Sequence, residues 1–368
     1  MSGSPARRAT RGRFDRRLAR RGGMVEVLRL PAALFGALAR LRSALYRWRV
    51  LPAYRVEPPV VSVGNISAGG TGKTPACVWV VQHLQALGRR PGLLSRGYGR
   101  GQRSLNDEGL LLARLLPGVP HVQDPDRVAG ARQLEELGVD AIVLDDGFQH
   151  RRLVRDLDLV LVDATRPWGL AAVGEGAEPV QAMLPRGLLR EPPRALARAT
   201  LLVVTRSDAV TPERLQALTA RLRALAPGCP LALARHAPVA LFALEDDRLV
   251  PRDRGELDGA RVDLLSAIGN PEAFERTVMD MGATVVSHRA FPDHHAYRTA
   301  DLEGLGSRPV VTTGKDAVKL DGVELPLLVL DVALEIVEGE SVLQELLEGL
   351  PESARARERD ALHEGLHG

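Results

Sequence analysis

Short apolar runs alternate with longer amphipathic stretches along most of the chain from Pro58 onward. The runs are rich in valine, isoleucine and leucine and are typical of buried strands, and the stretches between them are typical of crossover helices. The expected strands are, in order, Val60–Val63, Gly92–Ser95, Ala141–Leu144, Leu159–Val162, Leu201–Thr205, Leu231–Arg235, Val262–Ala267, Thr284–Ser287, Val310–Thr313 and Leu327–Leu330. This alternation predicts an α/β fold built on a parallel sheet.

The expected strands fall into two sets of five, which indicates two domains. The stretch Ala224–Pro230 separates the sets and contains two prolines and a glycine, residues that interrupt both helices and strands. A length of 368 residues also exceeds that of one typical domain. We therefore expect a phosphate-binding domain over 57–228, a smaller α/β domain over 229–345 and a C-terminal tail over 346–368.

A different pattern precedes the first strand, within residues 24–56. Apolar side chains recur there at helical spacing with arginines on either side, which predicts a basic amphipathic helix. The apolar stripe comprises Leu30, Leu34, Leu38, Leu41, Leu45 and Trp48. The longest uncharged run of this segment, Leu30–Ala39, has ten residues, whereas about 20 are needed to cross a bilayer. This pattern favours a helix lying in a membrane interface, and a helix docked on its own domain is the alternative interpretation.

Charge is distributed unevenly along the chain. Residues 1–56 contain fourteen Arg against Asp15 and Glu26, a net charge of +12, so the remainder carries −9 of the total of +3. Residues 1–23, with eight Arg and no apolar periodicity, are expected to be a disordered basic tail. A basic N-terminal segment followed by an acidic remainder favours an anionic membrane surface as partner and argues against nucleic-acid binding. Two cysteines exclude a disulfide framework and indicate a reducing compartment.

A glycine-rich motif follows the first expected strand. The segment Gly64–Thr74, GNISAGGTGKT, connects that strand to an apolar helix and predicts a phosphate loop. Its backbone N–H groups would surround phosphate oxygens, Lys73 would reach the β- and γ-phosphates, and the Thr74 hydroxyl suits Mg²⁺. The expected nucleotide-binding residues are Ser67, Ala68, Gly69, Gly70, Thr71, Gly72, Lys73 and Thr74. Ser67 stands where the usual pattern has its first glycine.

Two aspartates end the strand Ala141–Leu144. Asp145 and Asp146 occupy the position at which phosphate-loop NTPases hold their metal, so together with Thr74 they are the expected Mg²⁺ residues. Lysine usage adds to this picture, because Lys73, Lys315 and Lys319 are the only lysines among 49 basic residues. Where lysine persists against such a bias, we expect a role for a compact ammonium that Arg cannot imitate.

Taken in order, these segments resemble the tetraacyldisaccharide 4'-kinase family, which phosphorylates a lipid A precursor at the bacterial inner membrane. The resemblance extends from about Val25 to the strand at Leu327. The matching stretches are VSVGNISAGGTGKTP, LLSRGYGR, VLDDGFQHRRLVRDLDLVLVDA, LLREP, SAIGNPEAFE, FPDHHAY and VTTGKDAVKL. The resemblance implies a two-domain α/β kinase that uses ATP and Mg²⁺ and lies at the cytoplasmic face of the membrane through its N-terminal helix.

The resemblance also implies a base and its partner. Asp107 matches the aspartate that activates the sugar hydroxyl, and His294 matches the histidine paired with that base. The segment around Asp107 is Asn106-Asp107-Glu108-Gly109 in place of the family's Gly-Asp-Glu-Pro. The same comparison gives Lys73, Thr74, Asp145 and Asp146 the phosphate and metal roles that the motifs predict.

Arg190 in LLREP resembles a family arginine near the nucleotide phosphates. An insertion between Gly174 and Pro185, longer and more acidic than the family's, precedes it. Gly314 replaces the glutamate that usually precedes Lys315, so we keep Lys315 as a candidate site residue without a defined role.

A second function class stays open from the sequence. Thr205-Arg206-Ser207-Asp208 ends a strand where nucleotide switches carry a guanine-reading N/T-K-x-D motif, although Arg206 replaces its lysine. The alternative function is therefore a phosphate-loop GTPase or a nucleotide switch of the metal-insertion type. A preference for ATP over GTP would favour the kinase.

Overall fold

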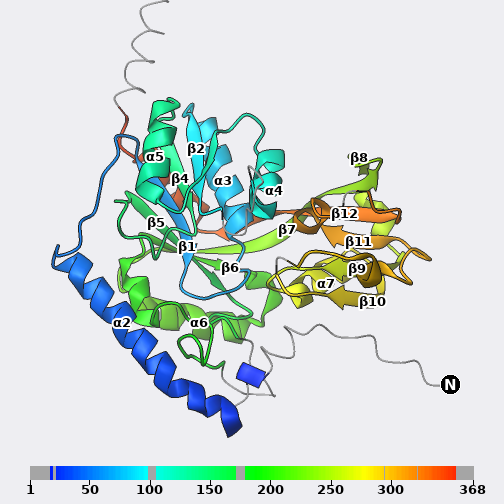
Figure 1. Cartoon of the computed structure of the whole chain (residues 1–368), viewed down its shortest axis with the longest axis horizontal. Helices are drawn as coiled ribbons and strands as arrows, with labels where there is room; N and C mark the ends of the chain where they lie inside the picture. The colour runs from blue at the N-terminus through cyan, green and yellow to red at the C-terminus, as the bar shows by residue number, and fades with distance from the viewer. Residues whose placement is uncertain are drawn as a thin grey trace, which may run out of the picture. The chain divides into compact units, whose positions relative to one another are not determined.

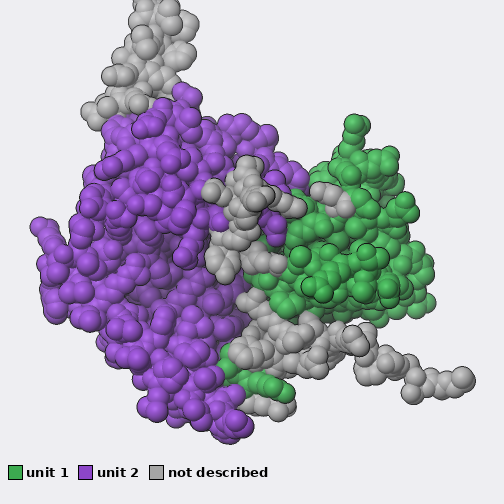
Figure 2. All heavy atoms as spheres, in the orientation of Figure 1, with its two compact units in different colours: residues 1–18, 236–333 green, residues 19–235, 334–368 purple. Residues whose placement is uncertain are grey.

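The computed structural model divides the chain into two compact units (Figures 1 and 2). The larger unit comprises Ala19–Arg235 and Leu334–Gly368, and the smaller comprises Met1–Leu18 and His236–Ala333. The structure describes residues 17–19, 22–97, 105–170, 179–293, 295–320 and 322–353. Two strands, β7 (Leu231–Glu245) and β12 (Leu327–Glu338), carry the chain from one unit to the other and back.

A parallel sheet forms the centre of the larger unit. Its strand order is β6-β5-β1-β4-β2-β3, and the first residues of β7 pair in parallel with β6 (Figure 1). The strands are β1 (Val60–Asn65), β2 (Pro91–Ser95), β3 (His121–Gln123), β4 (Ala141–Asp145), β5 (Leu157–Asp163) and β6 (Leu201–Thr205). Because the strands are parallel, their carboxyl ends lie along one edge of the sheet, where ligands bind in open α/β sheets.

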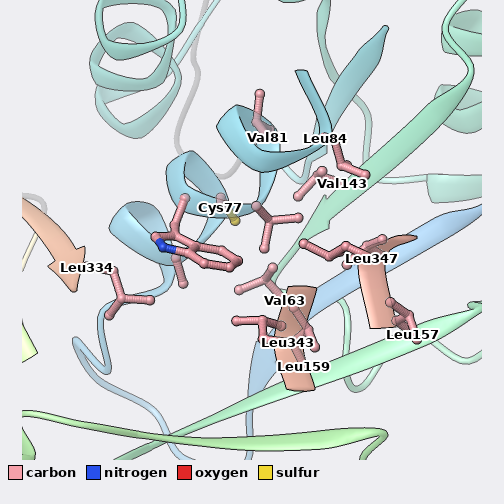
Figure 3. Packing of buried hydrophobic residues seen from close by; sticks show 14 of the residues in the cluster. Val63, Cys77, Val81, Leu84, Val143, Leu157, Leu159, Leu334, Leu343 and Leu347 are labelled. Carbon is pink, nitrogen blue, oxygen red and sulfur yellow. The ribbon is translucent and has the colours of Figure 1, made fainter. Parts of the chain in front are cut away.

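Both faces of this sheet are covered, which explains why central strands such as β4 and β6 have four consecutive apolar residues rather than an alternating pattern. On one face, Val61, Val63 and Val143 pack with α3 (Lys73–Ala86) and with α10 (Glu340–Glu348) (Figure 3). On the other face, the strand residues whose side chains point the opposite way pack against α5 (Arg127–Glu136) and α6 (Pro212–Leu225). The described residues of this unit also contain the helices η1 (Gly23–Leu28), α2 (Arg29–Arg47), α4 (Asp107–Leu115), η2 (Pro193–Arg198) and η3 (Ser207–Ala209).

The smaller unit has its own parallel strands in the order β10-β9-β11-β12, with β8 antiparallel to β7. Its elements are β8 (Arg248–Arg252), η4 (Arg254–Leu257), β9 (Arg261–Ser266), α7 (Pro271–Asp280), β10 (Thr284–Ala290), α8 (Thr299–Leu302), β11 (Val310–Thr313) and α9 (Gly314–Ala317). Val262, Leu264 and Phe274 belong to its apolar core.

The α/β fold predicted from the sequence is confirmed, and all ten expected strands are present. The division between units differs from the expected one. It lies between Arg235 and His236 rather than at 228/229, because the Pro- and Gly-rich stretch is only the turn from α6 into a long β7. The chain also returns to the larger unit at Leu334. The expected tail from 346 therefore begins inside α10, whose Leu347 is fully buried.

The N-terminal region departs from its expected disorder at one point. Of residues 1–23, the structure describes Arg17–Ala19 and Gly22–Gly23, and Arg17–Ala19 are helical with Leu18 only 2% exposed. Leu18 is an apolar side chain among arginines, and its burial gives this turn an anchor that periodicity alone does not predict.

Helix α2 turns its leucine stripe outward. Leu30, Leu34 and Leu38 are 80%, 63% and 56% exposed, whereas Ala32 and Gly36 on the same helix are buried. Small residues therefore form the face that docks, and an added Cβ at Gly36 would lie 3.4 Å from Met183 Cγ. Among the described residues, no helix has both the length and the hydropathy needed to cross a bilayer.

Polar and cation–π contacts add to this docking of the N-terminal segment. Glu26 forms an ion pair of 2.8 Å with the buried Arg186. Further along, Arg151 Nη1 donates to the Ser43 carbonyl at 3.0 Å, and its guanidinium lies 5.2 Å from the centre of the Tyr46 ring. The helix is thus docked on its own unit while its apolar stripe stays uncovered.

Candidate active site

The phosphate loop lies where the sequence places it, between β1 and the first residue of α3. Gly69 and Gly72 have φ values of +133° and +92°, conformations that favour glycine. Ser67 is not among the residues with positive φ, and it forms an isolated β-bridge with Leu189. The usual glycine is dispensable at position 67 for that reason. Asn65 Nδ2, at the end of β1, donates to Thr71 Oγ1 at 2.8 Å and so connects the strand to the loop.

The acidic pair ends β4 and faces this loop. Asp145 is the last strand residue and is buried, with Cys77 Sγ 3.7 Å from its Oδ1. Asp146 follows with φ +53°, a left-handed backbone that is uncommon outside glycine. Its carboxylate accepts from Arg190 Nη1 at 2.7 and 2.9 Å and lies 3.5 Å from Lys73 Nζ. Three of the predicted site residues, Lys73, Asp146 and Arg190, are therefore brought into direct contact.

The two aspartates have opposite electrostatic environments. Burial, reinforced by the charge of Glu108, raises the pKa of Asp145 to about 7. Burial acts on Asp146 in the same direction, but Lys73 and Arg190 outweigh it and lower the pKa of Asp146 to about 2. Asp146 is thus fixed as an anion. A cation that approaches Asp145 would favour the ionised form of its carboxyl group.

The oxygen donors of this edge fit a magnesium ion. Mg²⁺ binds protein through one or two carboxylates and takes its other ligands from phosphates and water. Asp145, Asp146 and the half-buried Thr74 offer hard oxygen ligands of this kind. Within the described residues no group of three or more His, Cys, Asp or Glu could hold a metal by itself.

A polar network that the sequence reasoning missed supports Arg190. Gln149 Nε2 donates to the Asn65 carbonyl at 2.8 Å and to Glu191 Oε1 at 3.2 Å. Glu191 is buried and also pairs with Arg198 at 2.8 Å. Gln149 and Glu191 lie inside the matching stretches DDGFQH and LLREP, and this is the signal that could have found them.

Arg127 is a second residue that the sequence reasoning missed. It opens α5 and is only 4% exposed, and its Nη1 donates to the Asp124 carbonyl at 2.8 Å. Burial lowers its pKa, whereas the charges of Asp145 and Asp146 act to raise it. The guanidinium of Arg127 therefore lies within electrostatic reach of the acidic pair.

Asp107 is the first residue of α4. Asn106 caps this helix by accepting from the Gly109 N–H at 2.9 Å, which explains why the departure from the family's segment leaves a regular helix start. The neighbouring Glu108 acts on Asp145 through its charge. Among the described residues, the Asp107 carboxylate forms no ion pair with Lys73 or Arg190.

His294 lies outside the described residues, so the pairing of Asp107 with His294 stays a prediction. Its neighbours belong to the smaller unit. His295 stacks on Phe291 with ring centres 4.4 Å apart, and its Nε2 lies 2.8 Å from Asp301 Oδ2. Lys315 Nζ lies 2.9 Å from Asp293 Oδ1.

Comparison with known proteins identifies the family. Residues 24–351 match the model of the tetraacyldisaccharide-1-P 4'-kinase family. A tetraacyldisaccharide 4'-kinase from Anaeromyxobacter dehalogenans is 43% identical over 352 residues, covering 87% of this chain and 89% of that protein. The chain belongs to this family. A kinase of the same description from Alkalilimnicola ehrlichii is 40% identical over 309 residues, covering 80% of this chain and 83% of that protein.

A solved member of the family shares the fold. The crystal structure of LpxK from Aquifex aeolicus in complex with ATP has a TM-score of 0.65 and 28% identity, covering 87% of this chain and 97% of that one. The prediction of a tetraacyldisaccharide 4'-kinase is confirmed by this membership. The alternative of a GTPase or metal-insertion switch gains no support from the comparisons.

Proposed function

We propose that this chain transfers the γ-phosphoryl group of ATP to the 4'-hydroxyl of a tetraacyldisaccharide 1-phosphate, a lipid A precursor, at the cytoplasmic face of the inner membrane. The observation that carries the proposal is the contact of Lys73 and Arg190 with Asp146 beside the phosphate loop, in a chain of this kinase family. Two cations and a carboxylate gathered at a helix N-terminus suit a nucleoside triphosphate with its metal.

The residues of the larger unit act mainly by positioning and by charge. Lys73 and Arg190, which Asp146 holds before the nucleotide arrives, neutralise charge on the transferring phosphoryl group. Thr74, Asp145 and Asp146 would hold Mg²⁺, which would supply further neutralisation of the phosphates. Asp107, partnered by His294, accepts the proton of the attacking hydroxyl.

The direct test is phosphate transfer to the defined acceptor. Purified protein with radiolabelled ATP, Mg²⁺ and tetraacyldisaccharide 1-phosphate in mixed micelles should yield a labelled lipid. A Lys73→Ala variant run in parallel should yield none, and replacing ATP by GTP should yield little. Turnover with GTP equal to that with ATP would overturn the assignment of ATP as donor.

A double-mutant cycle tests Asp107 as the catalytic base and His294 as its partner. Asp107→Asn and His294→Ala should each lower kcat by roughly 10²- to 10⁴-fold, and the double variant should lose little more than the worse single one. Affinity for MgATP should change little in all three. Glu213→Gln, which alters an acidic residue in the first turn of α6, is the matched control and should retain kcat. Losses that multiply would show that Asp107 and His294 act independently.

The N-terminal helix attaches the enzyme to the membrane surface that contains its substrate. The uncovered leucine stripe of α2 supports this proposal, as do the arginines beside it at positions 29, 40, 42 and 47. A helix with one apolar face and a basic border lies in the interface of an anionic bilayer. An acceptor carrying four acyl chains remains in that bilayer, so attachment brings the site to it.

A further inference from the structure

The strand next to β5 ends in a residue whose role the family assignment leaves open. Arg206 follows β6 with φ +53°, and among the described residues it is one of few other than glycine in the left-handed region. Its Nη1 donates to the Gly70 carbonyl in the phosphate loop at 3.0 Å and forms a short ion pair with Asp163, the last residue of β5. The two side chains are 12% and 3% exposed.

The geometry of a phosphate loop explains why such contacts matter. When successive N–H groups turn inward around a phosphate, the carbonyls of the same peptides turn outward, and those without a donor inside the loop need one behind it. Arg206 supplies that donor for Gly70. The Thr205 hydroxyl supplies it for the next peptide, since its Oγ1 donates to the Thr71 carbonyl at 2.9 Å. Both donors come from the end of one strand, about 135 residues along the chain.

We propose that Arg206 and Asp163 form a latch that holds the phosphate loop in its binding conformation, with Arg206 as a positioning residue for phosphoryl transfer. The inference deepens the proposed function and rests on it. In this chain the arginine of Thr205-Arg206-Ser207-Asp208 is bonded to the loop, so this segment braces the phosphate site. Asp163 fixes the guanidinium, and Asp163 itself is held by the N–H and hydroxyl of Thr165 at 2.9 and 2.6 Å.

The left-handed backbone at Arg206 offers a way to distinguish the effect of the side chain from the effect of backbone strain. Glycine would adopt φ +53° without strain, whereas arginine adopts it at a cost. The side chain's bonds to Gly70 and Asp163 must offset that cost. Arg206→Gly therefore removes the latch and relieves the backbone at once, which makes it the most informative substitution.

The experiment measures MgATP binding by calorimetry without lipid acceptor, alongside melting temperature. We expect Arg206→Gly and Arg206→Gln to raise the Kd for MgATP roughly ten- to a hundredfold, because one loop carbonyl loses its donor. Arg206→Lys keeps the charge but not the planar guanidinium, so its Kd for MgATP should lie between those of these variants and that of the wild type. The KM for the lipid acceptor should stay unchanged in all three.

Two further variants distinguish the latch from a general contribution to stability. Adding Asp163→Asn to Arg206→Gln should restore part of the melting temperature, because the buried carboxylate no longer lacks its partner, but it should not restore MgATP affinity. Arg155→Gln is the matched control. It breaks a buried pair of 2.9 Å with Asp158 at the opposite end of β5, so it should lower the melting temperature and leave the Kd unchanged.

The outcomes separate the two proposals. Wild-type protein that fails to bind MgATP would overturn the proposed function together with the latch. Tight MgATP binding by Arg206→Gly, equal to that of the wild type, would overturn the latch alone. A rise in Kd as large in Arg155→Gln as in Arg206→Gln would do the same, because the effect would then follow stability and not the loop.

Discussion

Each of the three lysines is largely buried beside an aspartate. Lys73, Lys315 and Lys319 pair with Asp146, Asp293 and Asp316 at 3.5, 2.9 and 2.7 Å, and their side chains are 17%, 13% and 7% exposed. A compact ammonium fits such confined positions, whereas a planar guanidinium needs a wider one. Arg155 and Arg206 are buried beside aspartates to a similar degree, so burial alone does not select lysine, and we expect the shape of the ammonium to matter at these three positions.

Lys73→Arg tests this argument at the phosphate loop. The substitution keeps the charge but not the compact shape, so we expect kcat to fall nearly as far as in Lys73→Ala. Phosphate transfer by the two variants, at saturating ATP, is the measurement. Near-normal turnover in Lys73→Arg would show that charge alone is required at this position.

His121 gives the larger unit a stability that depends on pH. Its Nε2 lies 2.8 Å from Ser95 Oγ, and burial lowers its pKa to about 4. The unfolded chain has a histidine pKa near 6.5 and so binds more protons between about pH 6.5 and pH 4, which means that acidification through this window favours unfolding. This contribution is complete above pH 6.5 and is lost as pH falls toward 4.

Denaturant titrations at pH 7 and pH 5 test the role of His121. The wild type should lose up to about 1.4 kcal/mol of unfolding free energy per pH unit through this residue, less whatever solvent screening removes. His121→Gln should be less stable at pH 7 and should show a shallower dependence on pH. Identical slopes for the two proteins would contradict a buried neutral histidine.

At the scale of elements, α2 shows how one pattern allows two interpretations until packing is known. The leucine stripe predicts a helix whether it faces a bilayer or the protein. The structure shows docking through Ala32 and Gly36, with Leu34 and Leu38 uncovered. Small residues carry little apolar signal in a periodicity, so the docking face could not be read from the sequence.

Liposome flotation tests whether the leucine stripe of α2 binds membranes. With vesicles containing anionic lipid, the wild type should float, and high salt should release it only in part because screening weakens the arginine contribution and not the apolar one. Leu34→Gln with Leu38→Gln should abolish flotation. Leu137→Gln, at a position 58% exposed elsewhere in the larger unit, should float like the wild type. Wild-type protein that stays in solution at low salt would exclude this attachment.

The strands and the site differ in how far the sequence predicts them. Buried parallel strands such as β4 and β6 are continuous apolar runs with clear ends. By contrast, β3 has three residues and β8 is exposed and carries arginines and Pro251, so neither has such a pattern. The phosphate loop and the acidic pair are local motifs. Partners such as Arg206 and Glu191 are not, because their contacts join residues far apart in the chain.

At the scale of the whole molecule, the chain completes its larger unit last. After the smaller unit, β12 and α10 return to the larger one, where Leu343, Leu347 and Leu350 are each at most 5% exposed within the core cluster that contains α3 (Figure 3). Arg89 ties the end of this segment by donating to the Leu350 and Pro351 carbonyls at 2.7 and 3.1 Å. The helix that carries Lys73 thus packs against residues from the end of the described chain.

Truncation tests this dependence. A chain ending at Gly339 keeps every proposed site residue but loses α10. It should therefore melt far below the full chain and bind MgATP poorly, because removing a single buried leucine side chain already costs about 2–5 kcal/mol. Leu347→Ala should show that loss in a chain that still folds. A chain ending at Ser353 keeps Leu350 and both carbonyls bound by Arg89, so its melting temperature should match that of the full chain. Equal melting temperatures for the two truncated chains would show that the larger unit is stable without its C-terminal helix.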